Sequence, residues 1–437
     1  MAQRLTITDT DFTEKFATFL TSKREVSADV DTATRGIIDA VKAEGDKALI
    51  ALSQKFDHVD LAELGIRVTE DEIDQASAAA DPDTIAALEF AHQRITDYHL
   101  RQRPTDDSFT DDIGAKLGSR WTAVESVGLY VPGGLASYPS SVLMNAVPAK
   151  VAGVPRIVMV VPSPRGELNP LVLAAGRIAG ADEIYRVGGA QAIAALAYGT
   201  DTIAPVAKIV GPGNAYVAAA KRQVFGVVGI DSIAGPSEVL VIADQDNDPE
   251  WIAADLLAQA EHDTAAQSIL MTDNADFAAQ VEAAVERQLA QLNRSEIAAA
   301  SWRDFGATIV LENFAQAPPL ADRIAAEHLE IATPDCEQLS KQIRNAGAIF
   351  LGRHTPEVIG DYVAGSNHVL PTARSARFSS GLGVLDFMKR TSILQLSEAA
   401  LSALAPAAMT LAENEGLDAH RRSVEIRLGT GNKDRKT

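Results

Sequence analysis

The chain has 437 residues, of which 46% are hydrophobic and 22% are charged, and its formal net charge is −20. This length predicts two or three domains, and the negative charge argues against a nucleic-acid partner because it would repel phosphate backbones. No segment approaches the roughly 18 uncharged apolar residues that a spanning helix needs, so we expect no membrane partner either.

The first 120 residues are predicted to be largely helical. Residues 1–16 mix charged and polar side chains without an apolar core, so we expect no secretory signal. Residues 101–118 are polar and charged and are predicted to form a linker or an exposed loop. A glycine-rich turn at 128–134 contains Tyr130, which would either stack on a flat cofactor ring or simply pack.

Short apolar runs then alternate with amphipathic segments as far as residue 273. Strands that recur roughly every 25 residues, each followed by a helix, imply crossover connections and a mainly parallel sheet. Ligands gather at the carboxyl ends of such strands, where Gly188-Gly189 and Gly211-Pro212-Gly213 lie. The expected strands are 157–161, 183–187, 208–210, 239–243 and one beginning at 268, and the expected helices are 170–180, 190–198, 214–225 and 249–262.

The same rhythm returns further along the chain, which predicts a second α/β sheet rather than one long one. Beyond Gly381 the pattern becomes helical again, with helices expected at 397–414 and 418–428. The expected elements between these regions are helix 275–292, strand 308–311, helix 318–328, a strand at Ile331, helix 335–345 and strand 348–351.

The segment 211–216 lies between an expected strand and an expected helix. Its glycines let the backbone approach a ligand, and a helix N-terminus favours anions. Tyr216 occupies the position of the last glycine in the dinucleotide fingerprint, so the segment is either a cofactor loop or only a tight turn.

Several polar residues interrupt the apolar faces of the expected helices. Gln259 and His262 lie on the same face of the expected helix as Leu256. They are either two ligands of one metal or hydrogen-bonded structural residues. His328 follows Ile324 in the same way, and Glu327 lies beside it. This second pair is either an acid/base pair or an exposed glutamate with a helix-capping histidine.

Two further polar residues complete a candidate ligand set. His420 aligns with apolar residues of the last expected helix, and Asp361 follows Gly360 at the end of a short helix. With Gln259, His262 and His328, they form a set of nitrogen and oxygen ligands that suits a catalytic Zn²⁺ site. Their spacing in the sequence does not show that they converge.

The single cysteine, Cys336, excludes a disulfide within the chain and fits a reducing compartment. A cysteine can carry an aldehyde as a thiohemiacetal, but Cys336 stands at an expected helix start and is predicted to be inert. If the protein oxidises an aldehyde, we expect water to be the nucleophile.

Taken in order, nine stretches of the chain resemble the histidinol dehydrogenase family over nearly its whole length. No stretch is specific alone, but the ordered series is. One departure is Gly365-Ser366 before Asn367, where we expected proline in many relatives. The stretches are 128–134, 187–191, 210–214, 234–238, 259–263, 326–329, 360–362, 367–372 and 415–420.

The resemblance implies a role for each candidate residue. One Zn²⁺ per subunit would be held by Gln259, His262, Asp361 and His420, and these four would also contact the substrate. The other substrate-binding residues would be Ser237, His328, His368 and Glu415. NAD would contact Tyr130, Gln191 and Asn214, and Glu327 and His328 would be the catalytic proton-transfer pair.

The activity that the resemblance implies is the four-electron oxidation of L-histidinol, through L-histidinaldehyde, to L-histidine with two NAD. This is the last step of histidine biosynthesis, carried out in the cytoplasm by a homodimer with shared active sites.

The implied fold is α/β, with two Rossmann-like parallel-sheet domains, helical N- and C-terminal extensions and an aldehyde-dehydrogenase-like architecture. The expected domains are an N-terminal helical segment (1–28), a discontinuous α/β domain (29–129 and 239–381), a second Rossmann-like domain (130–238) and a C-terminal helical arm (382–437) that is exchanged in the dimer.

Two other functions have to be weighed. A sister zinc- and NAD-dependent alcohol dehydrogenase acting on another hydroxyl compound should lack some of the residues that read an imidazole and an amine. A catalytically dead binding protein should have lost Glu327, His328 or a zinc ligand. All of these residues are present, which favours the histidinol reaction.

Overall fold

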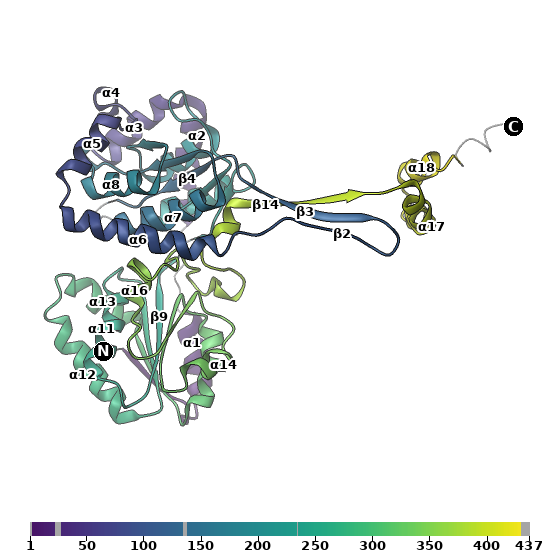
Figure 1. Ribbon diagram of the computed structural model, residues 1–437. Coiled ribbons are helices and arrows are strands. Elements are labelled where there is room, and N and C mark those ends of the chain that lie inside the picture. Colours follow the sequence, from purple (N-terminus) through teal and green to yellow (C-terminus); the bar gives the residue numbers. More distant parts are fainter. Residues whose placement is uncertain (1, 22–27, 134–137, 234, 430–437) are drawn as a thin grey trace. The chain divides into compact units, whose positions relative to one another are not determined.

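The computed structural model describes residues 2–21, 28–133, 138–233 and 235–429. It divides into two compact units, of which the first is Met1–Gln102 with Val124–Phe387 and the second is Arg103–Ala123 with Met388–Thr437. The first unit contains two parallel sheets, which confirms the expected α/β class (Figure 1). Among the described residues, no helix combines the length and the apolar character needed to cross a membrane.

The five-stranded sheet has the order β6-β5-β4-β7-β8, with every pair parallel. From β4 the chain builds outward to β5 and β6 and then returns to β7 on the other side. The order therefore reverses between β4 and β7, and this is where such sheets bind ligands. The strands are β4 Val127–Tyr130, β5 Ile157–Val160, β6 Glu183–Tyr185, β7 Lys208–Val210 and β8 Gly229–Ile230.

The helices that connect these strands begin where the sequence predicted. The side chains of Asn169 and Asn214 accept hydrogen bonds from the first free backbone N–H groups of α8 and α10. Gly180 ends α8 in the left-handed conformation, which costs glycine little. The helices are α7 Pro139–Ala152, α8 Pro170–Ala179, α9 Gly189–Tyr198 and α10 Ala215–Val224.

The N-terminal helices also belong to the five-stranded sheet. Helix α2 packs on α9 and α10, α5 on α8, and α6 on α7, and Ile38 and Leu49 share a core with Val158. These contacts differ from the expected grouping of 29–129 with 239–381, because an apolar helix face does not specify which sheet it covers. The helices are α2 Ala28–Glu44, α3 Asp46–Phe56, α4 Leu61–Leu64, α5 Glu70–Ala79 and α6 Pro82–Leu100.

The six-stranded sheet has the order β1-β11-β10-β9-β12-β13 and is also parallel. The segment 1–28, expected to be helical, contributes its edge strand β1. The strands are β1 Gln3–Thr6, β9 Glu238–Ala243, β10 Gln267–Thr272, β11 Ala307–Val310, β12 His328–Ala332 and β13 Ala348–Leu351.

Helices cover both faces of this sheet. Val239 and Val241 pack against α11, α12 and α13, whereas Leu240 and Ile242 pack against α1 and α14. Both faces are apolar because alternate side chains of a buried strand enter opposite cores. The helices are α1 Phe12–Thr21, α11 Pro249–Ala260, α12 Ala275–Leu289, α13 Ser295–Phe305, α14 Ala317–Ile324, α15 Cys336–Ser340 and α16 Glu357–Tyr362.

Two helix ends differ from the prediction at candidate site residues. Helix 318–328 was expected to contain Glu327 and His328, but α14 ends at Ile324 because Ala325 adopts a left-handed conformation with φ 49°. His328 is instead the first residue of the buried strand β12. His262 lies just beyond the end of α11 rather than inside it.

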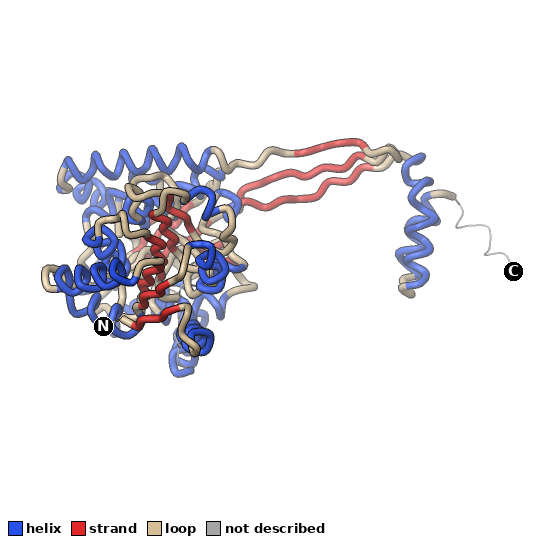
Figure 2. Tube along the Cα trace, turned by 90° about the horizontal axis from the view of Figure 1, so that it is seen from below, coloured by secondary structure: helices blue, strands red, loops and turns tan. Residues whose placement is uncertain are grey.

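The second unit is an antiparallel three-stranded sheet of order β14-β3-β2 followed by two helices (Figure 2). The helices α17 Glu398–Asn414 and α18 Asp418–Arg427 confirm the prediction. The strands β2 Asp107–Thr110, β3 Lys116–Ala123 and β14 Met388–Gln395 correct it, because a linker and a helical segment were expected there. Their side chains are mostly exposed, so no buried alternation marked them as strands.

Candidate active site

A cavity of about 1040 Å³ in the first unit is bounded by parts of both parallel sheets. Gly211 and Pro212 follow β7 at the carboxyl edge of the five-stranded sheet, whereas Ser237 and Glu327 precede β9 and β12 at the amino edge of the six-stranded sheet. The cavity gathers seven of the expected site residues: Asn214, Ser237, His262, Glu327, His328, Asp361 and His368.

The carboxyl group of Glu327 is buried and held by backbone and side chain. It accepts a hydrogen bond from the N–H of Glu238 at 3.2 Å and one from the hydroxyl of Ser237. Burial raises its pKa to about 7, although the charge of His328 acts to lower it. A carboxyl group that titrates near neutrality can take a proton from water and return it.

The imidazole of His328 lies among three carboxyl groups. Its Nδ1 is 3.7 Å from Glu357 and 3.9 Å from Glu327, and its Nε2 is 3.5 Å from Asp361. Burial acts to lower the pKa of His328, but the charges of Glu357 and Glu327 and the hydrogen bond to Asp361 raise it to about 10. A cation bound to Asp361 would oppose this effect and make the neutral base available.

Three of the four expected zinc ligands lie together in the first unit. The Nε2 of Gln259 is 3.0 Å from Nδ1 of His262, and the buried Oε1 of Gln259 has no hydrogen-bond partner. Burial lowers the pKa of His262, which favours the neutral form that binds metals. Burial raises the pKa of Asp361, but the hydrogen bond and charge of His328 hold it below its ordinary value.

These groups fit a divalent ion of the zinc type, because they offer a neutral imidazole, a carboxylate and an amide oxygen that has no partner. Within the described part of the chain, no three His, Cys, Asp or Glu side chains form a metal site by themselves.

His420, the fourth expected ligand, and Glu415 both belong to the second unit. Both are exposed, with His420 in α18 and Glu415 at the C-terminal end of α17. The first unit by itself thus lacks two of the expected contacts.

His368 lies at the side of the cavity and is fixed at both ring nitrogens. Its Nδ1 is 2.9 Å from the backbone oxygen of Asp361, and its Nε2 is 3.2 Å from the hydroxyl of Ser141 in α7. The sequence did not single out Ser141. Burial lowers the pKa of His368, so its neutral form is favoured.

The three expected NAD contacts are not equivalent. Asn214 is exposed and lines the cavity, where it caps α10. Tyr130 is buried, and its hydroxyl accepts a hydrogen bond from Gly189 N–H at 3.1 Å, so its ring packs rather than offering a free face. Gln191 is also buried, and neither it nor Tyr130 is among the residues that line the cavity. Gly134 and Ala234, which belong to two of the family stretches, lie outside the described residues.

A run of buried carboxyl groups lies behind His328, and sequence analysis did not find it. Glu330 accepts a hydrogen bond from the backbone N–H of Glu357 at 2.7 Å and shares another with Asp255 of α11. Burial raises the pKa of Glu357 to about 8 and that of Asp255 to about 6. Each is a single acidic residue among apolar neighbours, so no motif marked it.

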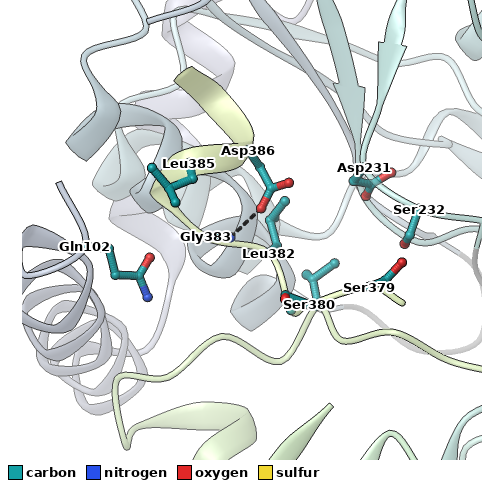
Figure 3. A pocket seen from close by; sticks show the side chains of 11 residues that line it. Gln102, Asp231, Ser232, Ser379, Ser380, Leu382, Gly383, Leu385 and Asp386 are labelled. Carbon is teal, nitrogen blue, oxygen red and sulfur yellow. Dashed lines mark hydrogen bonds between the residues drawn. The ribbon is translucent and has the colours of Figure 1, made fainter. Parts of the chain in front are cut away.

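A second cavity, of about 700 Å³, adjoins the first (Figure 3). The two share Asp231, Ser232 and Val369, and Gly383 N–H donates to Asp386 at 2.8 Å on the wall of the second. None of the expected site residues lines it. Cys336 lines neither cavity and packs beside a hydrophobic core.

Comparison with known proteins gives one consistent result. The sequence model of the family "Histidinol dehydrogenase" matches residues 20–428. The histidinol dehydrogenase of Agrobacterium fabrum is 72% identical over 96% of this chain and 97% of its own length, and that of Brucella suis is 69% identical over 98% and 100%. The crystal structure of histidinol dehydrogenase from Elizabethkingia anophelis superposes with a TM-score of 0.93 at 35% identity, over 99% of both chains. The chain therefore belongs to the histidinol dehydrogenase family.

Proposed function

We propose that the protein oxidises L-histidinol through L-histidinaldehyde to L-histidine, with two NAD as hydride acceptors. One observation carries the proposal: Glu327 and His328 face the same cavity as His262, Asp361 and His368. This arrangement offers two proton acceptors beside groups that bind nitrogen-rich ligands and metals. The names of the relatives supply the substrate, and no feature of the site favours a sister alcohol dehydrogenase.

Gln259, His262 and Asp361, together with His420, would hold one Zn²⁺. Bound there, the ion would supply a Lewis acid that helps these residues to hold the nitrogen groups of the substrate, with the carbinol carbon in a fixed place. Ser237, His368 and Glu415 would complete the substrate contacts. Positioning of this kind removes much of the entropic part of the barrier.

His328 would act as the base in both oxidation steps. Nδ1 lies 3.3 Å from the backbone oxygen of Glu238, whereas Nε2 lies 3.5 Å from Asp361, one of the expected zinc ligands. Nε2 would therefore take the hydroxyl proton while a hydride leaves the carbinol carbon for NAD. Glu327 would then take a proton from water, whose oxygen attacks the aldehyde carbon, while protonated His328 returns its proton to the aldehyde oxygen, which gives the hydrate and restores the neutral base. His328 would take a hydroxyl proton of that hydrate as the second hydride leaves.

NAD would bind at the carboxyl edge of the five-stranded sheet, with Asn214 in direct contact. For Tyr130 and Gln191 the buried positions support a less direct role, because the Tyr130 hydroxyl holds the backbone of Gly189 at the start of α9.

The active form would be a cytoplasmic homodimer in which Glu415 and His420 complete the site of the partner subunit. The apolar side chains of Leu411 in α17, Leu417 just before α18 and Ile426 in α18 are 63%, 41% and 52% exposed. Such a surface on two adjacent helices favours burial against a second copy.

Counting the NADH formed per molecule of L-histidinol tests the proposal. We expect two NADH for each substrate consumed, no free aldehyde, and loss of activity with a chelator that added Zn²⁺ restores. One NADH per substrate with aldehyde release, or faster oxidation of another hydroxyl compound, would refute it.

A further inference from the structure

A buried ion pair stands beside the carboxyl edge of the five-stranded sheet, and the proposed reaction gives it no role. Lys221 of α10 donates to the carboxylate of Asp231, which follows β8. The two side chains are 2% and 5% exposed. Burying two charges costs desolvation energy that their attraction often fails to recover, so such a pair is weak support for stability. The pair is better explained if it holds a neighbouring part of the backbone in one conformation.

The conformation in question is that of Gly211, since the ion pair binds both of its peptide groups. The N–H of Gly211 donates to Oδ2 of Asp231 at 2.8 Å, and Nζ of Lys221 donates to the carbonyl oxygen of Gly211 at 3.1 Å. The two side chains and the glycine backbone thus form a closed ring of hydrogen bonds.

Gly211 adopts a backbone conformation that no other residue could take here. Its φ is +109°, and a Cβ atom would lie 2.2 Å from the backbone oxygen of Tyr130. Glycine loses more conformational freedom on folding than any other residue, so an unclamped Gly211 would sample many conformations. The ion pair supplies the restraint that glycine lacks.

The restrained residue opens the loop that faces the cavity. Residues 211–214 run from the end of β7 to the cap of α10, and all four line the cavity together with Lys221 and Asp231. Figure 3 shows the Asp231 side chain beside Ser232 where the second cavity adjoins the first.

We propose that Lys221 and Asp231 are positioning residues for the cofactor, which hold the 211–214 loop in its NAD-binding conformation before NAD arrives. This inference rests on the proposed function, because it takes NAD as the ligand of the loop. A preformed loop binds more tightly because its ordering cost is met in folding rather than in binding. The ion pair contacts the loop backbone and none of the proposed substrate or zinc contacts.

The test replaces the pair by apolar side chains in the double variant Lys221→Met/Asp231→Leu, which leaves no unpaired buried charge. We expect the KM for NAD to rise about tenfold or more, because the loop must then be ordered by the ligand. The KM for histidinol and the kcat at saturating NAD should stay within about twofold of wild type, because only cofactor binding is affected. Hydrogen exchange of the ligand-free protein should show lost protection of the amides in 211–217.

A matched control removes another ion pair of the same sheet. Arg156 and Glu183 pair at 2.8 Å beside the amino ends of β5 and β6, at the edge opposite the loop. The variant Arg156→Leu/Glu183→Leu should leave the KM for NAD and the exchange of 211–217 unchanged. If the double variant of Lys221 and Asp231 does not fold, the single variant Lys221→Arg takes its place. Its planar guanidinium keeps the charge but cannot reproduce the point contact of an ammonium group, so the KM for NAD should again rise.

An unchanged KM for NAD in the folded variant, an equal rise in both KM values, or full protection of 211–217 would each overturn the clamp. Failure of the proposed function looks different, because the wild-type protein would then form no NADH from histidinol. The exchange measurement on ligand-free protein tests the clamp even in that case.

Discussion

The two ring nitrogens of His328 have different surroundings, and this difference assigns their roles. Nδ1 is turned to the backbone oxygen of Glu238 and to the carboxyl of Glu357. Nε2 is buried and lies 3.5 Å from Asp361, which lines the cavity. A base whose Nδ1 is held by the backbone presents its other nitrogen to the substrate in a fixed position.

Changing His328 to asparagine should lower kcat by about 10²- to 10⁴-fold, the range for loss of a general base. Bound zinc, measured by metal analysis, should remain at wild-type content because His328 is not one of the expected ligands. His354→Asn serves as control, since His354 is exposed and outside the cavity. Wild-type turnover in the His328 variant would refute the base assignment.

The sequence predicted individual residues of the site better than it predicted their surroundings. Apolar spacing singled out His262 and His328, but it placed both inside helices, and only the family resemblance implied that they meet. Glu357 and Glu330 were invisible, because a lone acidic residue in a short apolar segment has no periodic or motif signal. Their importance follows from burial, which one sequence does not reveal.

Helix α16 is attached to β12 through buried acid groups. Its first backbone N–H, that of Glu357, donates to Glu330 of β12, and Glu330 shares a hydrogen bond with Asp255 of α11. Because α16 carries Glu357 and Asp361 one turn apart, this attachment sets both carboxyl groups beside His328. The cost is a buried carboxyl group whose pKa is raised to about 8.

That cost predicts a pH-dependent gain in stability for Glu357→Gln. Below the ordinary pKa of 4.5 the carboxyl is protonated in both states, so wild type and variant should be similar. Between pH 4.5 and 8 the unfolded chain releases the proton while the folded protein keeps it, so wild-type stability falls as pH rises. The variant lacks this loss, which amounts to about 1.4 kcal/mol for each pH unit between the two pKa values.

Urea unfolding of the metal-free protein at pH 5 and pH 8 measures the effect. The stability advantage of the variant over wild type should be larger at pH 8 than at pH 5. Glu337→Gln, at an exposed glutamate of α15, should show no such difference. An equal gain at both pH values would contradict the buried titration.

The central strands of the two parallel sheets were predictable because both of their faces are buried, and the expected strand 208–210 coincides with β7. The expected strand 348–351 coincides with β13 although Ile349 and Leu351 of this edge strand are exposed, and asparagine caps marked the starts of α8 and α10. The strands of the second unit were not predictable, since β2 and most of β14 are exposed and carry no apolar alternation. Antiparallel pairing holds these strands, and pairing partners distant in sequence leave no local trace.

In the first unit, the two parallel sheets contribute opposite edges to one cavity. Both have a strand order that reverses, between β4 and β7 in one sheet and between β9 and β12 in the other. The five-stranded sheet uses its carboxyl edge, as such sheets usually do. At the carboxyl edge of the six-stranded sheet, Arg353 donates to both oxygens of Asp244, at 3.1 and 3.0 Å. The ion pair occupies that edge, and Ser237, Glu327 and His328 stand at the other.

The proposed sharing of each site between two subunits has a consequence for mixed dimers. Glu327 belongs to the first unit and His420 to the second, so in the proposed dimer a given site takes each from a different chain. Glu327→Gln and His420→Asn homodimers should each be nearly inactive, the former without a base for water and the latter without a zinc ligand. A mixed dimer would contain one site with both defects and one with neither. After subunit exchange, half of the dimers are mixed and half of their sites are intact, so about a quarter of wild-type activity should return when exchange is random.

Exchange is followed by mass spectrometry with one isotopically labelled variant. The control mixes the Glu327→Gln variant with the His354→Asn variant in the same way. Because His354 lies outside the site, only sites whose first unit comes from the His354→Asn parent should be active. Demonstrated exchange without recovery would show that each chain completes its own site.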